Sequence, residues 1–291
     1  MLQNDREMYL SGIVVAGDIC NTDSSFDVKT QSLIRYFSFC RGISPQADRA
    51  ESAFNKGLEL LGKARNLGLH VGITAHAPYS ASAGLMHKIA AASRDEGYPM
   101  SIHFQESAEE LEFISTGGGK MAERIERMGI DISDYEPVKD GQTGWLLKNA
   151  ATAQKIIAVH NTWSSPEDVT RLNLGFRDVS FCLCPSANLY IGGKLPSIDF
   201  IIRLRRRFAL EPTAWLNTAP DMLQEMQILQ SNFNLNLKTL IPWASLNGAK
   251  ALGIDSEFGS FTKGKKPGIV HLSKVNHKEL LILPDCRSRI I

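Results

Sequence analysis

Cysteine is scarce in this sequence, and none of it is spaced for pairing or for zinc. The 291 residues include five cysteines, an odd number without any Cys-x-x-Cys spacing. Small secreted domains held by disulfides and structural zinc sites both use closely spaced cysteines, so neither is expected here. Scattered free thiols are typical of a reducing compartment, which predicts a cytoplasmic protein.

Two further features are missing, an excess of charge and a long apolar run. The net charge is +1, which gives no electrostatic basis for binding nucleic acid or an anionic membrane. No apolar segment approaches the ~20 residues that cross a bilayer, and the N-terminus lacks a signal-peptide pattern. The expected partner is a small-molecule substrate, with no nucleic acid and no membrane, while a homo-oligomer stays open.

Short apolar runs alternate with amphipathic segments along the chain. Buried strands are predicted at 12–19, 32–40, 69–80, 98–107, 155–165 and 178–188. Helices are predicted between them, among others at 44–68, which begins with Ser-Pro, and at 82–97, which ends at a glycine. Strands separated by helices form parallel sheets through right-handed crossovers. No glycine-rich loop follows the first strand, which disfavours an open dinucleotide-binding sheet.

Polar side chains follow four successive strands of this pattern. They are His76, His103 with Glu106, His160 with Asn161, and Ser186 with Asn188. In a β/α barrel the carboxyl ends of all strands meet at one face, which carries the active site. The pattern therefore predicts a β/α-barrel enzyme. The stretch 130–151 is interpreted either as an extra loop or helix over the barrel mouth or as an insertion packed on the surface.

His103, Glu106 and His160 together suit metal-assisted hydrolysis. An imidazole at a strand end binds zinc or iron, and a carboxylate three residues later could move the proton of a metal-bound water. His160 could hydrogen-bond that water or stabilise a developing oxyanion. Two alternatives stay open: the histidines are structural residues at buried strand ends, or Glu106 and His160 are the acid and base of a metal-free lyase or isomerase.

Several segments resemble, in order, those of the amidohydrolase superfamily: HAPYSAS, IHFQES, VHNTWSS, CPSANLYIGGKLP and SLNGAKALGIDSEFGSFTKGKKPGIV. The branch that they resemble contains chlorohydrolases, guanine deaminase and S-adenosylhomocysteine deaminases, and the similarity runs from Gly12 onward. The resemblance implies an α/β fold, a TIM-type (β/α)8 barrel of the metal-dependent hydrolase kind that holds one divalent metal, zinc or iron. It also implies hydrolysis of a C–N bond (deamination) or a C–Cl bond on a small heterocyclic substrate.

The resemblance further implies a role for each polar residue at the strand ends. His103 matches the metal-binding histidine of the fifth strand, and Glu106 matches the catalytic proton shuttle. His160 matches the sixth-strand histidine that orients water and substrate, so it is counted with Glu106 as catalytic. The implied substrate-side residues are His76, Gln105, Ser186 and Asn188.

The first family motif without a counterpart is the His-x-His of the first barrel strand. No histidine precedes His70, so the barrel is expected to lack that strand. The expected domains are an incomplete barrel at 1–258 and, at 259–291, a remnant of the small β-domain that flanks it. Removing one strand predicts a gap between its two neighbours, whose unpaired edges favour aggregation or recruitment of a partner.

The second family motif without a counterpart is the Gly-Thr-Asp-Ser of the eighth strand, which carries a metal-binding aspartate. The matching stretch, 209–223, has Glu211 and Pro212 near that position, and proline fits a central strand poorly. Three single-base deletions would convert codons for the motif into codons for this stretch, which suggests a compensated frameshift. Glu211 is a weak candidate for a replacement ligand. Asp18 is also a carboxylate near the active-site edge of the expected barrel, and it is interpreted as a structural residue.

The absence of these two family motifs affects the expected metal binding and hydrolase activity. A stable zinc site uses three or four protein ligands, and of the usual set this chain retains His103. We therefore predict that the polypeptide binds metal poorly and has little or no hydrolase activity. The alternative function is a catalytically dead remnant, such as a pseudogene product, or a binding module.

Overall fold

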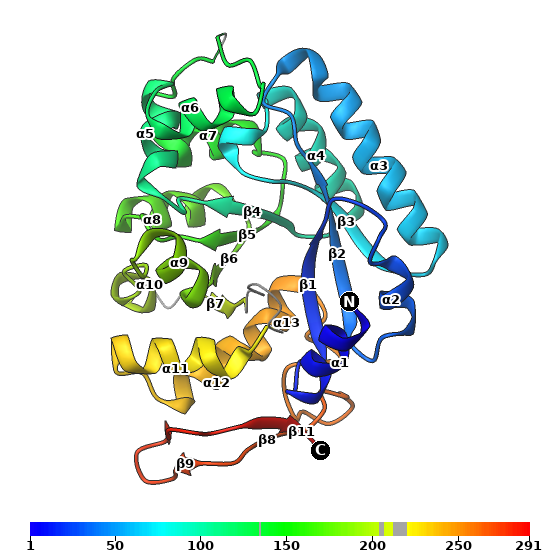
Figure 1. Ribbon diagram of the computed structural model, residues 1–291, viewed down its shortest axis with the longest axis vertical. Coiled ribbons are helices and arrows are strands. Elements are labelled where there is room, and N and C mark those ends of the chain that lie inside the picture. Colours follow the sequence, from blue (N-terminus) through cyan, green and yellow to red (C-terminus); the bar gives the residue numbers. More distant parts are fainter. Residues whose placement is uncertain (134, 204–206, 212–219) are drawn as a thin grey trace.

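Parallel strands form two sheets that lie side by side in the computed structural model, which describes residues 1–133, 135–203, 207–211 and 220–291 (Figure 1). The first sheet has the order β1-β2-β3, with strands Val15–Cys20, Arg35–Gly42 and His70–Ala75. The second has the order β4-β5-β6-β7, with strands Met100–Phe104, Lys155–His160, Asp178–Leu183 and Arg207–Leu210. Each predicted strand overlaps one of these, so the parallel α/β architecture is confirmed.

Helices follow the strands and cover the outer face of the sheets (Figure 1). They are α3 (Ala50–Asn66), α4 (Ala83–Glu96), α5 (Ala108–Thr116), α6 (Lys120–Arg127), α7 (Gly141–Asn149), α8 (Pro166–Gly175), α9 (Pro185–Gly192), α10 (Asp199–Arg203), α11 (Met222–Phe233), α12 (Leu237–Ala244) and α13 (Leu246–Leu252). Local signals set their ends. At the start of α4 the Ser82 hydroxyl accepts from the Leu85 amide, and Gly97 ends the helix in the left-handed conformation.

Alternate residues of the strands belong to two apolar clusters, one on each face. Phe104, Phe181 and Phe208 lie fully buried in the larger cluster, between the strands and the helices. On the other face, Ile157 and Val159 join a smaller cluster to which α13 contributes. Burying both faces explains why these strands are nearly continuous apolar runs in the sequence.

The ring of strands is interrupted at two places in the described residues. Between β3 and β4 there is no ladder, and the His103 amide donates to the His76 carbonyl at 2.9 Å. At the other side, β1 pairs with β2 and β7 with β6, and neither pairs with the other. The second interruption lies where a gap in the barrel was predicted from the sequence. There α13 packs against β7, and its Leu252 approaches Gly17 of β1.

Two short antiparallel pairs follow the last helix. Strand β8 (Val270–Leu272) pairs with β11 (Ser288–Ile290), and β9 (Val275–Asn276) pairs with β10 (Leu281–Ile282). The N-terminal helix α1 (Leu2–Leu10) contacts β11. The domain boundary between 258 and 259 stays a prediction. Within the described residues, every helix is too short or too polar to span a bilayer.

The stretch 130–151, apart from residue 134, which lies outside the described residues, ends in helix α7. This helix contacts α4, α5 and α8, so it belongs to the outer helical layer. Its buried Gln142 and Thr143 side chains face residues near the candidate site. The contacts of α7 with other helices describe α7 alone, and whether the stretch covers the barrel mouth stays a prediction.

A buried lysine links β1 and β2 to the small helix α2 (Phe26–Gln31). The Lys29 ammonium lies 2.5 Å from Asp18 Oδ2, 2.8 Å from Cys20 Sγ and 2.9 Å from Ser38 Oγ. The Lys29 side chain is 4% exposed and that of Asp18 28% exposed. Asp18 is thus a structural partner of Lys29, as interpreted from the sequence.

We predict that Lys29→Met lowers the free energy of unfolding by about 3 kcal/mol, because it leaves the partly buried Asp18 carboxylate uncompensated. Adding Asp18→Asn should recover part of that loss, and urea unfolding followed by tryptophan fluorescence measures both. The control is Lys63→Met, which breaks the exposed Lys63–Asp23 pair and should change stability little. A loss for Lys29→Met no larger than the control's would contradict the structural role.

Candidate active site

Three of the predicted histidines converge at the carboxyl ends of neighbouring strands. In the β4–β5 ladder His103 lies opposite Val159 and Phe104 opposite His160. His103 Nδ1 and His160 Nε2 are 3.0 Å apart, and their rings stack with centroids 5.0 Å apart. The His76 ring, just beyond β3, meets the His103 ring edge-on at 5.0 Å. The structure thus brings His76, His103 and His160 together.

Unusual backbone conformations aim these side chains. Gln105, His160 and Asn161 all have positive φ, at 51°, 76° and 57°. Non-glycine residues in this region carry strain of order 1–3 kcal/mol each, which must be offset by neighbouring contacts. At Asn161 the side-chain amide donates to the Ala158 carbonyl at 2.8 Å, and the backbone amide donates to the Phe104 carbonyl at 3.0 Å. The turn at His160 directs its ring toward His103.

The hydrogen bonds of His160 determine which nitrogens carry protons. Asn188 Oδ1 lies 2.9 Å from His160 Nδ1 and accepts a hydrogen bond, so the proton of neutral His160 is on Nδ1. His160 Nε2 is then an acceptor, and His103 Nδ1 donates to it. This arrangement leaves the lone pair of His103 on Nε2. Asn188, predicted on the substrate side, therefore acts here on the tautomers of two histidines.

Glu106 lies beside His160, with Oε1 3.4 Å from His160 Nε2. Its backbone amide donates to Glu110 Oε2 at 2.8 Å, and Gln142 donates to the other oxygen of Glu110. Glu110 is 1% exposed and was not identified from the sequence. The signal was present as Ser107-x-x-Glu110, the spacing of a helix N-terminal cap, and Ser107 does cap α5.

Burial keeps His76 and His103 neutral. Burial is the main cause that lowers the pKa of His103 well below its ordinary value and that of His76 to about 4, and the charge of Arg41 adds to both shifts. Neutral imidazole is the form that offers a lone pair to a metal or accepts a proton. Arg41, near the end of β2, was not identified from the sequence. Its Nε is buried and has no hydrogen-bond partner among the described residues.

Gln105 and Ser186 point elsewhere in this structure. Gln105 Nε2 is 3.5 Å from the hydroxyl of Thr143 on α7. The Ser186 backbone amide donates to Glu225 Oε2 at 2.9 Å, and its hydroxyl donates to the other oxygen of that carboxylate. The side-chain contacts described for both residues are thus with the helical layer, and their substrate-side roles stay predictions.

The side chains that could hold a divalent metal ion are His103 and its acidic, cysteine and histidine neighbours. Among the described residues, no three His, Cys, Asp or Glu side chains are arranged to hold a metal ion. Glu211, the candidate replacement ligand, follows β7, and its Oε2 lies 3.9 and 3.8 Å from the thiols of Cys182 and Cys184. Burial raises the pKa of Glu211, which disfavours its ionised form. The described residues therefore do not fit a closed metal site, and Pro212 lies outside them.

A profile of the Amidohydrolase family matches residues 52–285. A 5-methylthioadenosine/S-adenosylhomocysteine deaminase of Thermococcus sibiricus is 27% identical over 191 residues, which are 62% of this chain and 40% of that protein. The chain thus spans less than half the length of this curated relative.

Two solved structures have the same fold. An aminofutalosine deaminase of Helicobacter pylori superposes with a TM-score of 0.83 at 20% identity, covering 97% of this chain and 72% of the other. A zinc-complexed atrazine chlorohydrolase of Arthrobacter aurescens TC1 superposes with a TM-score of 0.69 at 12% identity, covering 92% and 63%. At these identities the likeness establishes the TIM-barrel type of fold.

The buried Glu110 generates a pH-dependent stability. Burial raises its pKa from 4.5 to about 7, so between those values the folded chain holds a proton that the unfolded chain has lost. Stability should therefore fall by up to about 3 kcal/mol as pH rises from 4.5 to 8. We predict that Glu110→Gln removes this fall, because the amide has no charge to bury.

Urea unfolding at a series of pH values measures this difference between wild type and variant. The matched control is Glu112→Gln, an exposed position on the same helix, which should keep the wild-type profile. Parallel profiles for wild type and Glu110→Gln would show that Glu110 is not the responsible group.

Proposed function

The chain belongs to the amidohydrolase family, and from that premise we propose that its site is built for hydrolytic deamination of a small heterocyclic substrate. The observation that carries the proposal is the convergence of His103, Glu106 and His160 at the ends of β4 and β5, with contacts of 3.0 and 3.4 Å. These are the residues that the resemblance assigned to metal, proton shuttle and water. The overall reaction exchanges an amino group for oxygen: water is consumed and ammonia leaves.

Glu106 is the proton carrier of the proposed reaction. Its carboxylate takes a proton from the attacking water and delivers it to the departing nitrogen, two transfers that one group can perform if it is near both. Glu110 fixes the Glu106 backbone through the 2.8 Å hydrogen bond. His160, whose Nε2 lies 3.4 Å from Glu106 Oε1, orients the water and the substrate once His103 Nδ1 no longer donates to that nitrogen, and Asn188 holds its ring. Neutral His103 and His76 line the same place without adding charge.

The proposed substrate class is a purine or related heterocycle that bears an exocyclic amino group. Support comes from the Thermococcus relative, which is named as a deaminase of 5-methylthioadenosine and S-adenosylhomocysteine. The same attack of water on a ring carbon displaces chloride, so hydrolysis of a C–Cl bond is a second candidate, favoured by the likeness to the atrazine chlorohydrolase fold.

We further propose that this polypeptide is impaired. In the family a divalent metal, zinc or iron, polarises the attacking water, and the described residues do not by themselves form its site. The alternative, a catalytically inert remnant or binding module, shares this prediction about the metal but predicts no turnover at all.

Metal analysis tests the impairment directly. We expect purified protein to contain well under one zinc per chain after dialysis against zinc and then buffer, because one imidazole holds the ion weakly. Replacing residues 211–217 by Gly-Thr-Asp-Ser-Leu-Ala-Ser-Asn should raise the zinc content, whereas the same replacement with Asn for Asp should not. Stoichiometric zinc in the original chain would overturn the proposed impairment.

Ammonia release tests the function. With zinc in excess, we expect slow release from methylthioadenosine, S-adenosylhomocysteine or guanine, and a fall of about 10²–10⁴-fold in Glu106→Gln. The matched control, Glu123→Gln, neutralises an exposed glutamate on α6 and should keep the wild-type rate. No release from any of these substrates, together with chloride release from a chlorinated triazine, would replace deamination by the second candidate. Absence of both would favour the inert remnant.

A further inference from the structure

A second concave region lies at the opposite end of the strands, where β5, β6 and β7 begin. Lys155, Asp178 and Arg207 are the first residues of these three strands. At ~3.3 Å per residue, the start of β5 is roughly 16 Å from His160 at its end. The region is therefore separate from the candidate active site.

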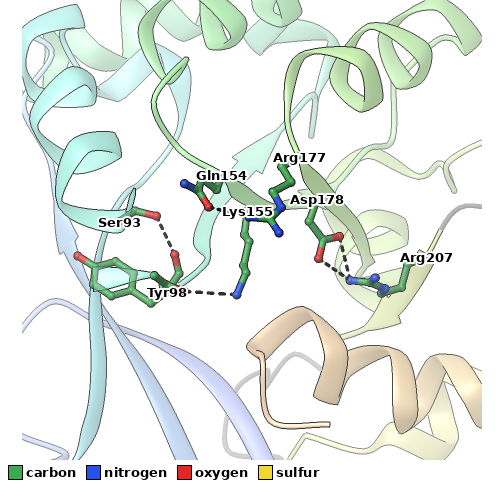
Figure 2. Close-up of a pocket in the computed structure, with 8 residues that line it drawn as sticks. Ser93, Tyr98, Gln154, Lys155, Arg177, Asp178 and Arg207 are labelled. Atoms are coloured by element: carbon green, nitrogen blue, oxygen red, sulfur yellow. Dashed lines mark hydrogen bonds and ion pairs between the residues drawn. The ribbon is translucent and has the colours of Figure 1, made fainter. Parts of the chain in front are cut away.

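Two adjoining cavities form this region, with volumes of about 470 and 440 Å³. Both are lined by Arg177, Asp178 and Arg207, so they share a wall. Figure 2 shows the first, with Lys155 extending into the space between Tyr98 and the Asp178–Arg207 pair. The second adds Lys250 from α13. Each volume lies in the range of small-molecule sites, ~300–1,000 Å³.

The charges of the lining do not balance. Four cations, Lys155, Arg177, Arg207 and Lys250, line the two cavities together with one carboxylate, Asp178. Asp178 is already paired, because its two oxygens lie 3.0 and 3.2 Å from Arg207 Nη1. Three positive charges therefore remain in excess over the carboxylate. Such an excess in a concave site attracts anions.

The remaining cations are weakly engaged by the protein. Lys155 Nζ donates to the Gly97 carbonyl at 3.4 Å, and Arg177 Nη1 donates to the Gln154 side chain at 3.5 Å. These distances are at the long limit for a hydrogen bond. Within the described ranges, none of Lys155, Arg177 and Lys250 lies in a salt bridge with a carboxylate. Their N–H donors, up to three on a lysine and five on an arginine, stay available for a ligand.

We propose that this end of the sheet binds a phosphorylated small molecule carrying two or more negative charges, such as the diphosphate group of a nucleotide. Arg177 supplies a planar donor pair that matches phosphate oxygens, and Lys155 and Lys250 supply point charges. Arg207 can add a donor only through the nitrogens other than Nη1, which holds Asp178 and Ser180. A single carboxylate would neutralise one of the three surplus charges, whereas a diphosphate neutralises nearly all of them.

Isothermal titration of the full chain with pyrophosphate, at constant ionic strength near 0.1 M, tests the proposal. We expect saturable binding of one pyrophosphate per chain, tighter than that of orthophosphate or succinate, and weakening as salt is raised. The double variant Arg177→Gln with Lys250→Gln should bind at least about tenfold more weakly. Both positions are exposed, so the substitutions leave the core untouched.

The matched control is Lys56→Gln with Lys120→Gln, which removes the same charge from exposed positions on α3 and α6. It should bind pyrophosphate within about twofold of wild type. The site is refuted if wild type shows no saturable binding, or if the two double variants weaken binding equally, since the effect would then be one of net charge. Succinate binding as tight as that of pyrophosphate would overturn the phosphate assignment.

Discussion

The parallel register between β4 and β5 is the constraint on which the candidate active site depends. It sets Phe104 opposite His160, so that the strands end level and His103 and His160 meet at 3.0 Å. A slip by one residue would turn each side chain to the other face of the sheet and separate the two rings. The register is in turn held by burial of both faces, because Ile102 and Phe104 pack outward on the helices while Ile157 and Val159 pack inward.

Burial has a chemical consequence at that edge. The same packing that sets the register excludes water from His76 and His103, which lowers the pKa of both and keeps them neutral beside Arg41. A neutral imidazole has one N–H donor and one acceptor nitrogen. Because the Asn188 oxygen can only accept, His160 donates to Asn188 and His103 donates to His160. Glu106 then faces an imidazole nitrogen whose protonation is already determined by its neighbours.

Much of the fold and of the candidate active site could be predicted from the sequence. Apolar runs located the parallel strands, and polar residues directly after those runs located the three histidines and Glu106. The break between β3 and β4 could not be predicted, because hydrophobic periodicity reports burial and not which strands pair. Gln105 was placed on the substrate side, yet its contact is with Thr143. Its φ of 51° departs from strand geometry, so its side chain does not follow the alternation of a strand. A positive φ at a glutamine could not be predicted from the residue type.

The two ends of the second sheet carry different groups, cations where the strands start and histidines where they end. An apolar layer lies between the two ends and limits how one can affect the other. Ile157, Val159 and Cys182 separate the cations at the strand starts from the histidines at the strand ends. An anion bound at the strand starts would therefore contact the strands and not the histidines, and its expected effect is on stability. Strand β7 pairs with β6 alone in the described sheet. A ligand that joins Arg207 of β7 to Arg177 and Lys155 would tie this outer strand to its neighbours and favour the folded chain in proportion to RT ln(1 + [L]/Kd).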